Sequence, residues 1–164
     1  MRLDVLIAEL RALDERVAKL DAEIVRRAKN DSTARRLMTI PGIGAITATA
    51  LIALAPSATI FRRGRDFAAW LGLTPVQRSS GGKERLGRTS RMGERTLRRL
   101  LIIGANAVVS WASRKGTATG TWLVGMMSRK PPMLVRVALA NNMARTVWAL
   151  LARGGVYRAP AVTA

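Results

Sequence analysis

Leucine, valine and isoleucine recur in steps of three and four along the first 29 residues. This apolar seam consists of Leu3, Leu6, Leu10, Leu13, Val17, Leu20 and Ile24. Charged residues occupy the other faces of the helix that this spacing predicts. A narrow seam with solvated flanks is typical of a helix that pairs with another helix. We therefore predict a coiled-coil helix over residues 1–29 and a homo-oligomer formed through it. An amphipathic helix that packs on its own domain is the alternative.

Helical spacing of apolar residues continues beyond the break at Asn30-Asp31-Ser32, which offers an N-cap for the next helix. Longer helices are predicted over 94–113 and 133–153, and no strand-like alternation is evident. The predicted fold class is all-α, with a compact helical domain over 30–155 and a disordered tail over 156–164. Asn141 and Asn142 interrupt the apolar face of the last helix, either as buried hydrogen-bonding groups or as nucleic-acid contacts.

A Pro-Gly-x-Gly turn, Pro41 to Gly44, joins two apolar helical segments near residues 35–54. Gly42 and Gly44 let the backbone bend tightly and approach a phosphate without a Cβ in the way. The amides that begin the second helix would then point at the anion. The pattern predicts a helix-hairpin-helix that contacts a nucleic-acid backbone, and an ordinary helix pair with a glycine turn is the alternative.

Residues 72–93, called the basic segment below, have almost no apolar periodicity. Their cations are Arg78, Lys83, Arg85, Arg88 and Arg91, against the single acid Glu84. Two hydroxyls, Ser79 and Ser80, precede the glycine pair at 81–82. A long polar loop inside an apolar chain is more often functional than accidental. We predict a phosphate-binding loop that also holds a nucleophile.

Three further arginines, Arg95, Arg98 and Arg99, begin the helix that follows the basic segment. Cations at a helix N-terminus oppose the helix dipole, so their presence needs a separate reason. A bound phosphate backbone is one such reason, and plain solvation is the other. We predict that these arginines bind nucleic acid.

The charge balance supports a polyanionic partner. The 164 residues carry a formal net charge of +18, and the sequence pI is about 12.0. The printed chain has no cysteine and no histidine, which removes thiolate and histidine catalysis and the usual zinc sites. No apolar run is long enough to span a bilayer. These features predict a cytoplasmic protein without a membrane partner.

These motifs occur in one order: the turn at 39–44, the segment 67–75, the run 79–93 and the basic helix start 97–101. In that order and spacing they resemble the C-terminal transposase domain of the bridge-RNA-guided DEDD transposases of bacterial insertion sequences, relatives of the Piv DNA invertase. The resemblance covers roughly residues 31–155. In that family a coiled coil precedes this domain, and residues 1–29 are similar to its second half.

The resemblance implies a mechanism. Family members combine a RuvC-like domain, whose four acids hold Mg²⁺, with a C-terminal domain whose serine attacks the DNA backbone. The family serine maps to Ser80, with Ser79 as the neighbouring alternative and Ser90 as a weaker one. A guide (bridge) RNA selects the DNA. The acids beyond residue 29 do not form a four-acid site, so this chain is expected to bind no cofactor. Mg²⁺ is expected only in a RuvC-like partner domain.

Two functions from different classes follow. The chain is either the catalytic-serine part of a transposase, inactive without a RuvC-like domain, or a non-catalytic helix-hairpin-helix module or transposase remnant that binds nucleic acid. Replacement of Ser80 by alanine separates them, because only the first function needs that hydroxyl. A ribosome-associated or membrane-surface basic protein is a weaker third possibility.

Overall fold

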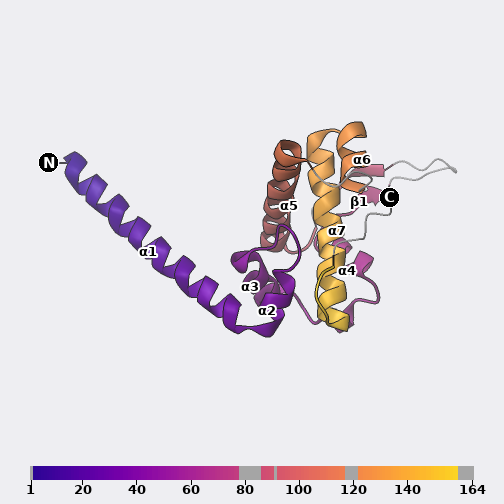
Figure 1. The fold of residues 1–164 in the computed structure, drawn as a ribbon, viewed down its shortest axis with the longest axis horizontal. Coiled ribbons are helices and arrows are strands. Elements are labelled where there is room, and N and C mark those ends of the chain that lie inside the picture. The colour runs from indigo at the N-terminus through magenta and orange to yellow at the C-terminus, as the bar shows by residue number, and fades with distance from the viewer. Residues whose placement is uncertain (1, 78–85, 91, 117–121, 159–164) are drawn as a thin grey trace.

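The first helix, α1, projects from the rest of the molecule (Figure 1). In this computed structural model, which describes residues 2–77, 86–90, 92–116 and 122–158, α1 covers Arg2–Asn30. Its last turns pack on the domain, where Ala28 is fully buried. The apolar seam from Leu3 to Leu20 is 49% to 68% exposed at each position. Within the described chain, nothing covers this seam, so the alternative of an amphipathic helix packed on its own domain is wrong for this part of α1.

The remaining elements form a helical domain, as predicted. They are α2 (Ser32–Leu37), α3 (Ala45–Leu54), the short 3-10 helix η1 (Ala58–Ile60), α4 (Gly64–Trp70), β1 (Pro75–Gln77), β2 (Leu86–Thr89), α5 (Arg95–Lys115), α6 (Trp122–Arg129) and α7 (Pro132–Arg153). Asp31 caps α2 by accepting a hydrogen bond from the backbone amide of Ala34 at 2.8 Å. The predicted N-cap is therefore confirmed.

The core lies where α5 and α7 run side by side and where α2, α3 and α4 pack against them (Figure 1). Its largest fully buried side chains are Phe67, Leu37, Leu51, Leu71, Leu73, Leu97, Leu101, Val135 and Val147. Most of them are aliphatic, in keeping with a chain that is only 4% aromatic. The rings of Phe61 and Trp70 pack on Phe67, with centroids 5.3 and 5.7 Å from its own. This cluster fixes α4, whose end leads into the basic segment.

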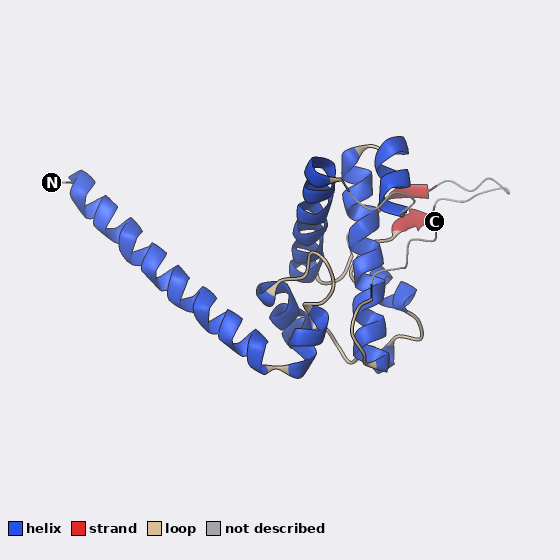
Figure 2. Ribbon diagram, in the orientation of Figure 1, coloured by secondary structure: helices blue, strands red, loops and turns tan. Residues whose placement is uncertain are grey.

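The mostly helical fold also contains one pair of short strands, which the all-α prediction did not include. β1 and β2 pair antiparallel, with Pro75 opposite Thr89 and Gln77 opposite Leu86. Figure 2 shows them on the side of the domain opposite to α1. Strands of three and four residues are too short for alternation to reveal them. The pair frames the middle of the basic segment.

The tail predicted to be disordered, residues 156–164, is ordered at its start. The backbone amide of Tyr157 donates a hydrogen bond to the hydroxyl of Thr39 at 2.9 Å, and the Tyr157 side chain packs against the core. The described part of the tail, through residue 158, therefore returns to the end of α2. Residues 159–164 lie outside the described part of the chain.

Candidate nucleic-acid interface

The two ends of the basic segment touch each other and the turn after α4. Gly72 and Gly93 both have left-handed backbone angles, with φ of +68° and +80°. A Cβ on Gly72 would lie 2.1 Å from the carbonyl oxygen of Met92, and a Cβ on Gly93 would lie 1.6 Å from that of Trp70. Only glycine satisfies both the angles and the close approach. The chain therefore enters and leaves the basic segment at one place, called the base of the loop below.

Arg98 holds the two ends of the basic segment together by hydrogen bonds. Its Nη1 donates hydrogen bonds to the carbonyl oxygens of Leu71, at 3.0 Å, and of Met92, at 2.9 Å. One guanidinium nitrogen of α5 therefore joins the chain entering the basic segment to the chain leaving it. The half-buried Arg98 was predicted to bind nucleic acid, and the structure gives it this intramolecular role.

Asn141 adds an anchor from α7. Its side-chain amide donates to the carbonyl oxygen of Leu73 at 3.2 Å, whereas the neighbouring Asn142 is exposed. Of the two roles that the sequence left open, internal hydrogen bonding is therefore the one shown for Asn141. A further bond, from the amide of Ser90 to the carbonyl of Thr74 at 2.9 Å, ties the two sides beside the strands. The base of the loop is thus held by helices α5 and α7.

Residues 78–85 and 91 of the basic segment lie outside the described part of the chain. They include the predicted nucleophile, its alternative and four of the predicted cations of this segment: Ser80, Ser79, Arg78, Lys83, Arg85 and Arg91. Arg88 is placed in β2 by its backbone. The roles of these residues stay predictions.

Arg95 and Arg99 are exposed on the first turns of α5. Glu94 caps this helix by accepting a hydrogen bond from the amide of Thr96 at 2.7 Å. The Glu94 carboxylate is therefore engaged as the N-cap of α5. The side chains of Arg95 and Arg99 are exposed to solvent. This arrangement leaves both cations available for a phosphate backbone.

The turn between α2 and α3 gives its two glycines different environments. Gly42 has φ of +86°, and a Cβ there would lie 2.7 Å from the carbonyl oxygen of Gly104 in α5. Gly42 is therefore required for packing. Gly44 caps α3 without a side-chain hydrogen bond, and nothing lies within 4 Å of a Cβ built on it. The first amides of a helix lack partners within it, and no side-chain cap is recorded for those of α3.

Two further findings concern metal ligands and membrane-spanning helices. Among the described residues, no three carboxylate or histidine side chains gather in a way that would hold a metal ion. The described helices also include none with the length and apolar character needed to cross a membrane.

Comparison with known proteins finds similarity to transposases. Residues 34–119 match the family described as Transposase IS116/IS110/IS902 family. A "Probable family 20 transposase" of Pseudomonas aeruginosa is 48% identical over 150 residues, which are 92% of this chain and 44% of the relative. A "Putative transposase y4pF/y4sB" of Sinorhizobium fredii is 40% identical over 151 residues, covering 92% of this chain and 39% of the relative.

A third relative is the "Transposase for insertion sequence element IS1111A" of Coxiella burnetii. It is 37% identical over 156 residues, which are 95% of this chain and 43% of the relative. The chain thus spans less than half the length of these curated relatives.

Proposed function

The chain belongs to the IS116/IS110/IS902 transposase family, and we propose that it is the part of a transposase that binds DNA and supplies a serine nucleophile. The observation that carries this proposal is the closed base of the basic segment. Gly72, Gly93 and Arg98 hold together the ends of a loop that carries Ser80 and five cations. A loop that only needed to be solvated would not require such anchors. A loop that must present a hydroxyl to a phosphodiester does require them.

The proposed reaction is a transesterification. The Oγ atom of Ser80 attacks the phosphorus of a DNA phosphodiester and forms a phosphoserine linkage. One bridging P–O bond breaks, and the DNA oxygen leaves as a hydroxyl after it takes up a proton. The number of phosphoester bonds is unchanged, so the step needs no oxidant or external energy source. Ser79 is the neighbouring alternative.

Lys83 and the arginines of the basic segment would stabilise the charge on the pentavalent phosphorus. Serine also needs a base, and the printed chain has no histidine. We assign the activation of the serine to a RuvC-like domain that acts together with this one. Among the described residues, no group of carboxylates fits an Mg²⁺ site, and the metal would belong to the RuvC-like domain.

Binding of the nucleic-acid backbone is assigned to the α2–α3 turn and to α5. We interpret α2, its turn and α3 as a helix-hairpin-helix in which the open N-terminus of α3, at Gly44, contacts a phosphate. Arg95 and Arg99 would bind further phosphates. The bound molecules would be DNA and a guide RNA. The exposed seam of α1 would pair with another helix and form a homo-oligomer.

A non-catalytic role is the second candidate. The exposed arginines and the open end of α3 can bind a phosphate backbone without Ser80, as a nucleic-acid-binding module or transposase remnant would. Both functions predict binding that weakens steeply as salt rises. They differ only in whether a covalent bond forms.

Covalent trapping tests the proposal. The chain is mixed with labelled insertion-end DNA, a candidate guide RNA, a separately expressed RuvC-like domain and Mg²⁺. A full-length relative serves as the positive control. We expect a denaturation-resistant protein–DNA adduct with the wild type and with Ser79→Ala, and none with Ser80→Ala. If the positive control forms the adduct and this chain only binds DNA, the non-catalytic function is correct.

A further inference from the structure

The exposed face of α5 carries a bulky apolar pair beside its arginines. Arg99, Ile103, Ala107 and Trp111 follow one another in steps of four, so each is a neighbour of the next in a row that winds slowly around α5. Ile103 is 53% exposed and Trp111 is 54% exposed. The indole is the largest apolar side chain, and tryptophan is enriched among contact residues at interfaces.

The α2–α3 turn packs on the same helix as Trp111. A Cβ on Gly42 would come within 3.0 Å of Cγ2 of Val108, which places the turn against this part of α5. Trp111 follows Val108 by about one helical turn, so these two residues are neighbours on the surface of α5. The open N-terminus of α3 at Gly44 belongs to that turn. The helix that carries the exposed ring therefore also carries the surface on which the α2–α3 turn packs.

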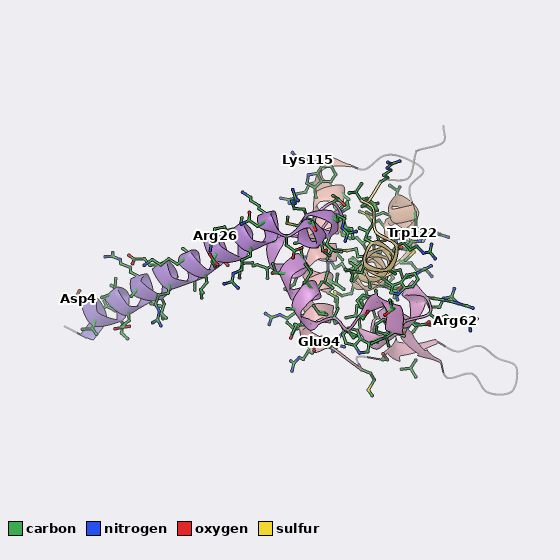
Figure 3. The ribbon with its side chains drawn as sticks, turned by 90° about the horizontal axis from the view of Figure 1, so that it is seen from below. Asp4, Arg26, Arg62, Glu94, Lys115 and Trp122 are labelled. Carbon is green, nitrogen blue, oxygen red and sulfur yellow. The ribbon has the colours of Figure 1, made fainter. Side chains whose placement is uncertain are left out.

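The charges of this face are all positive. Arg99 and Arg114 are exposed on either side of Ile103, and Lys115 is exposed at the C-terminal end of the helix. Figure 3 labels Glu94 and Lys115 at the two ends of α5. Glu94 is the acid nearest to this face along the helix, and its carboxylate caps α5. The charge pattern suits a polyanion rather than a protein surface of mixed charge.

We propose that Trp111 is a stacking platform for an unpaired base of a bound nucleic-acid strand, whose phosphates lie along the arginines of α5. This combination of a planar side chain with flanking cations is the general chemistry of single-strand recognition. A base in a duplex is already stacked on its neighbours, so its face is not accessible to the indole. The inference rests on the proposed nucleic-acid binding and adds that the strand bound here is unpaired.

The test compares three substitutions of Trp111 by fluorescence anisotropy. The probes are a labelled single-stranded DNA, a single-stranded RNA of the same sequence and the corresponding DNA duplex. Trp111→Ala and Trp111→Leu should weaken binding of the single strands by at least about fivefold, the lower end for loss of one stacked base. Trp111→Phe keeps a ring and should stay close to the wild type. Binding of the duplex should change by less than about twofold in all three variants.

Trp122→Leu is the matched control, since Trp122 is similarly exposed, at 49%, but lies on α6. It should leave binding of every probe unchanged. The inference is overturned if Trp111→Leu binds single strands as tightly as the wild type. That result is expected if the indole contacts only protein. It is also overturned if Trp111→Phe loses as much as Trp111→Ala. If the wild type binds the duplex and substitution of Trp111 changes the binding of no probe, this inference alone is contradicted. If the wild type binds no probe, the proposed function is contradicted as well.

Discussion

Gly42 and Gly104 pack backbone against backbone where the α2–α3 turn meets α5. A Cβ on Gly104 would lie 2.0 Å from the carbonyl oxygen of Gly42, and a Cβ on Gly42 would lie 2.7 Å from that of Gly104. Both distances are shorter than the van der Waals separation of a carbon and an oxygen atom, so neither position accepts a Cβ without a shift of the backbone. The pair therefore fixes the position of the open N-terminus of α3 on the helix that carries Arg95 and Arg99.

This packing predicts that Gly104→Ala is destabilising. Overpacking of a tight contact costs about 1–3 kcal/mol, which exceeds the gain in helix propensity from alanine. The free energy of unfolding is measured by urea denaturation followed by circular dichroism. Gly125→Ala in α6 is the control, because the nearest atom to its new Cβ would be the end of the Arg129 side chain at 3.8 Å. The control should be neutral or more stable by up to about 1 kcal/mol. Equal stability of the two variants would contradict the packing role.

Neighbouring arginines of α5 should behave differently. Arg98→Ala removes two hydrogen bonds at the base of the basic segment and should lower the free energy of unfolding by about 1–3 kcal/mol. Arg99→Ala should change it by less than about 0.5 kcal/mol, since Arg99 is exposed. Arg99→Ala should instead weaken DNA binding and reduce the slope of log K against log salt by about 0.9, as loss of one phosphate contact does. Indistinguishable unfolding curves for the two variants would refute the anchoring role of Arg98.

The N-terminus of α3 offers a test of phosphate binding. Gly44→Asp should stabilise the protein slightly, by a few tenths of a kcal/mol, because aspartate is a better N-cap than glycine. The same carboxylate would occupy the place of the phosphate and repel the DNA. A repulsion of about 1 kcal/mol at close range in water corresponds to about fivefold weaker binding. Gly44→Asn is the matched control, since it caps the helix without a charge. If both variants bind DNA like the wild type, no phosphate lies at this helix end.

The exposed seam of α1 predicts an assembly that depends on it. Leu10→Asp combined with Leu20→Asp places two charges in the seam and should give a monomer in sedimentation analysis. Ala8→Asp combined with Ala18→Asp adds the same charge on other faces of α1 and should leave the mass unchanged. An unchanged mass for the seam variant would rule out pairing through α1.

The helices were the most predictable part of the fold. The predicted start of the helix at residue 94 differs by one residue from α5, and the predicted start at 133 differs by one from α7. Both helices have a long apolar stripe with clear boundary residues, namely Glu94 before α5 and Gly154 after α7. The order of the motifs also predicted the transposase family, which the comparison confirms.

The anchors of the basic segment could not be predicted in the same way. Arg98 bonds Leu71 across 27 residues, and Asn141 bonds Leu73 across 68 residues. Contacts between residues so far apart in the sequence produce no periodic pattern from which they could be predicted. A charged residue near a basic loop looks like a phosphate ligand until the carbonyl oxygens around it are known. The packing role of Gly42 was equally hidden, because this glycine of the α2–α3 turn contacts Gly104, which lies far away in the sequence on α5.

The central claim is that Ser80 forms a covalent bond with DNA, and mass spectrometry of the trapped adduct tests it most directly. The adduct is digested with nuclease and trypsin, which should release residues 79–83 because Arg78 and Lys83 flank the two serines. Fragmentation of this peptide then separates Ser79 from Ser80. The account predicts a phosphonucleotide on Ser80. An adduct on any other residue, or an unmodified peptide while a full-length relative is modified at the matching serine, would contradict it.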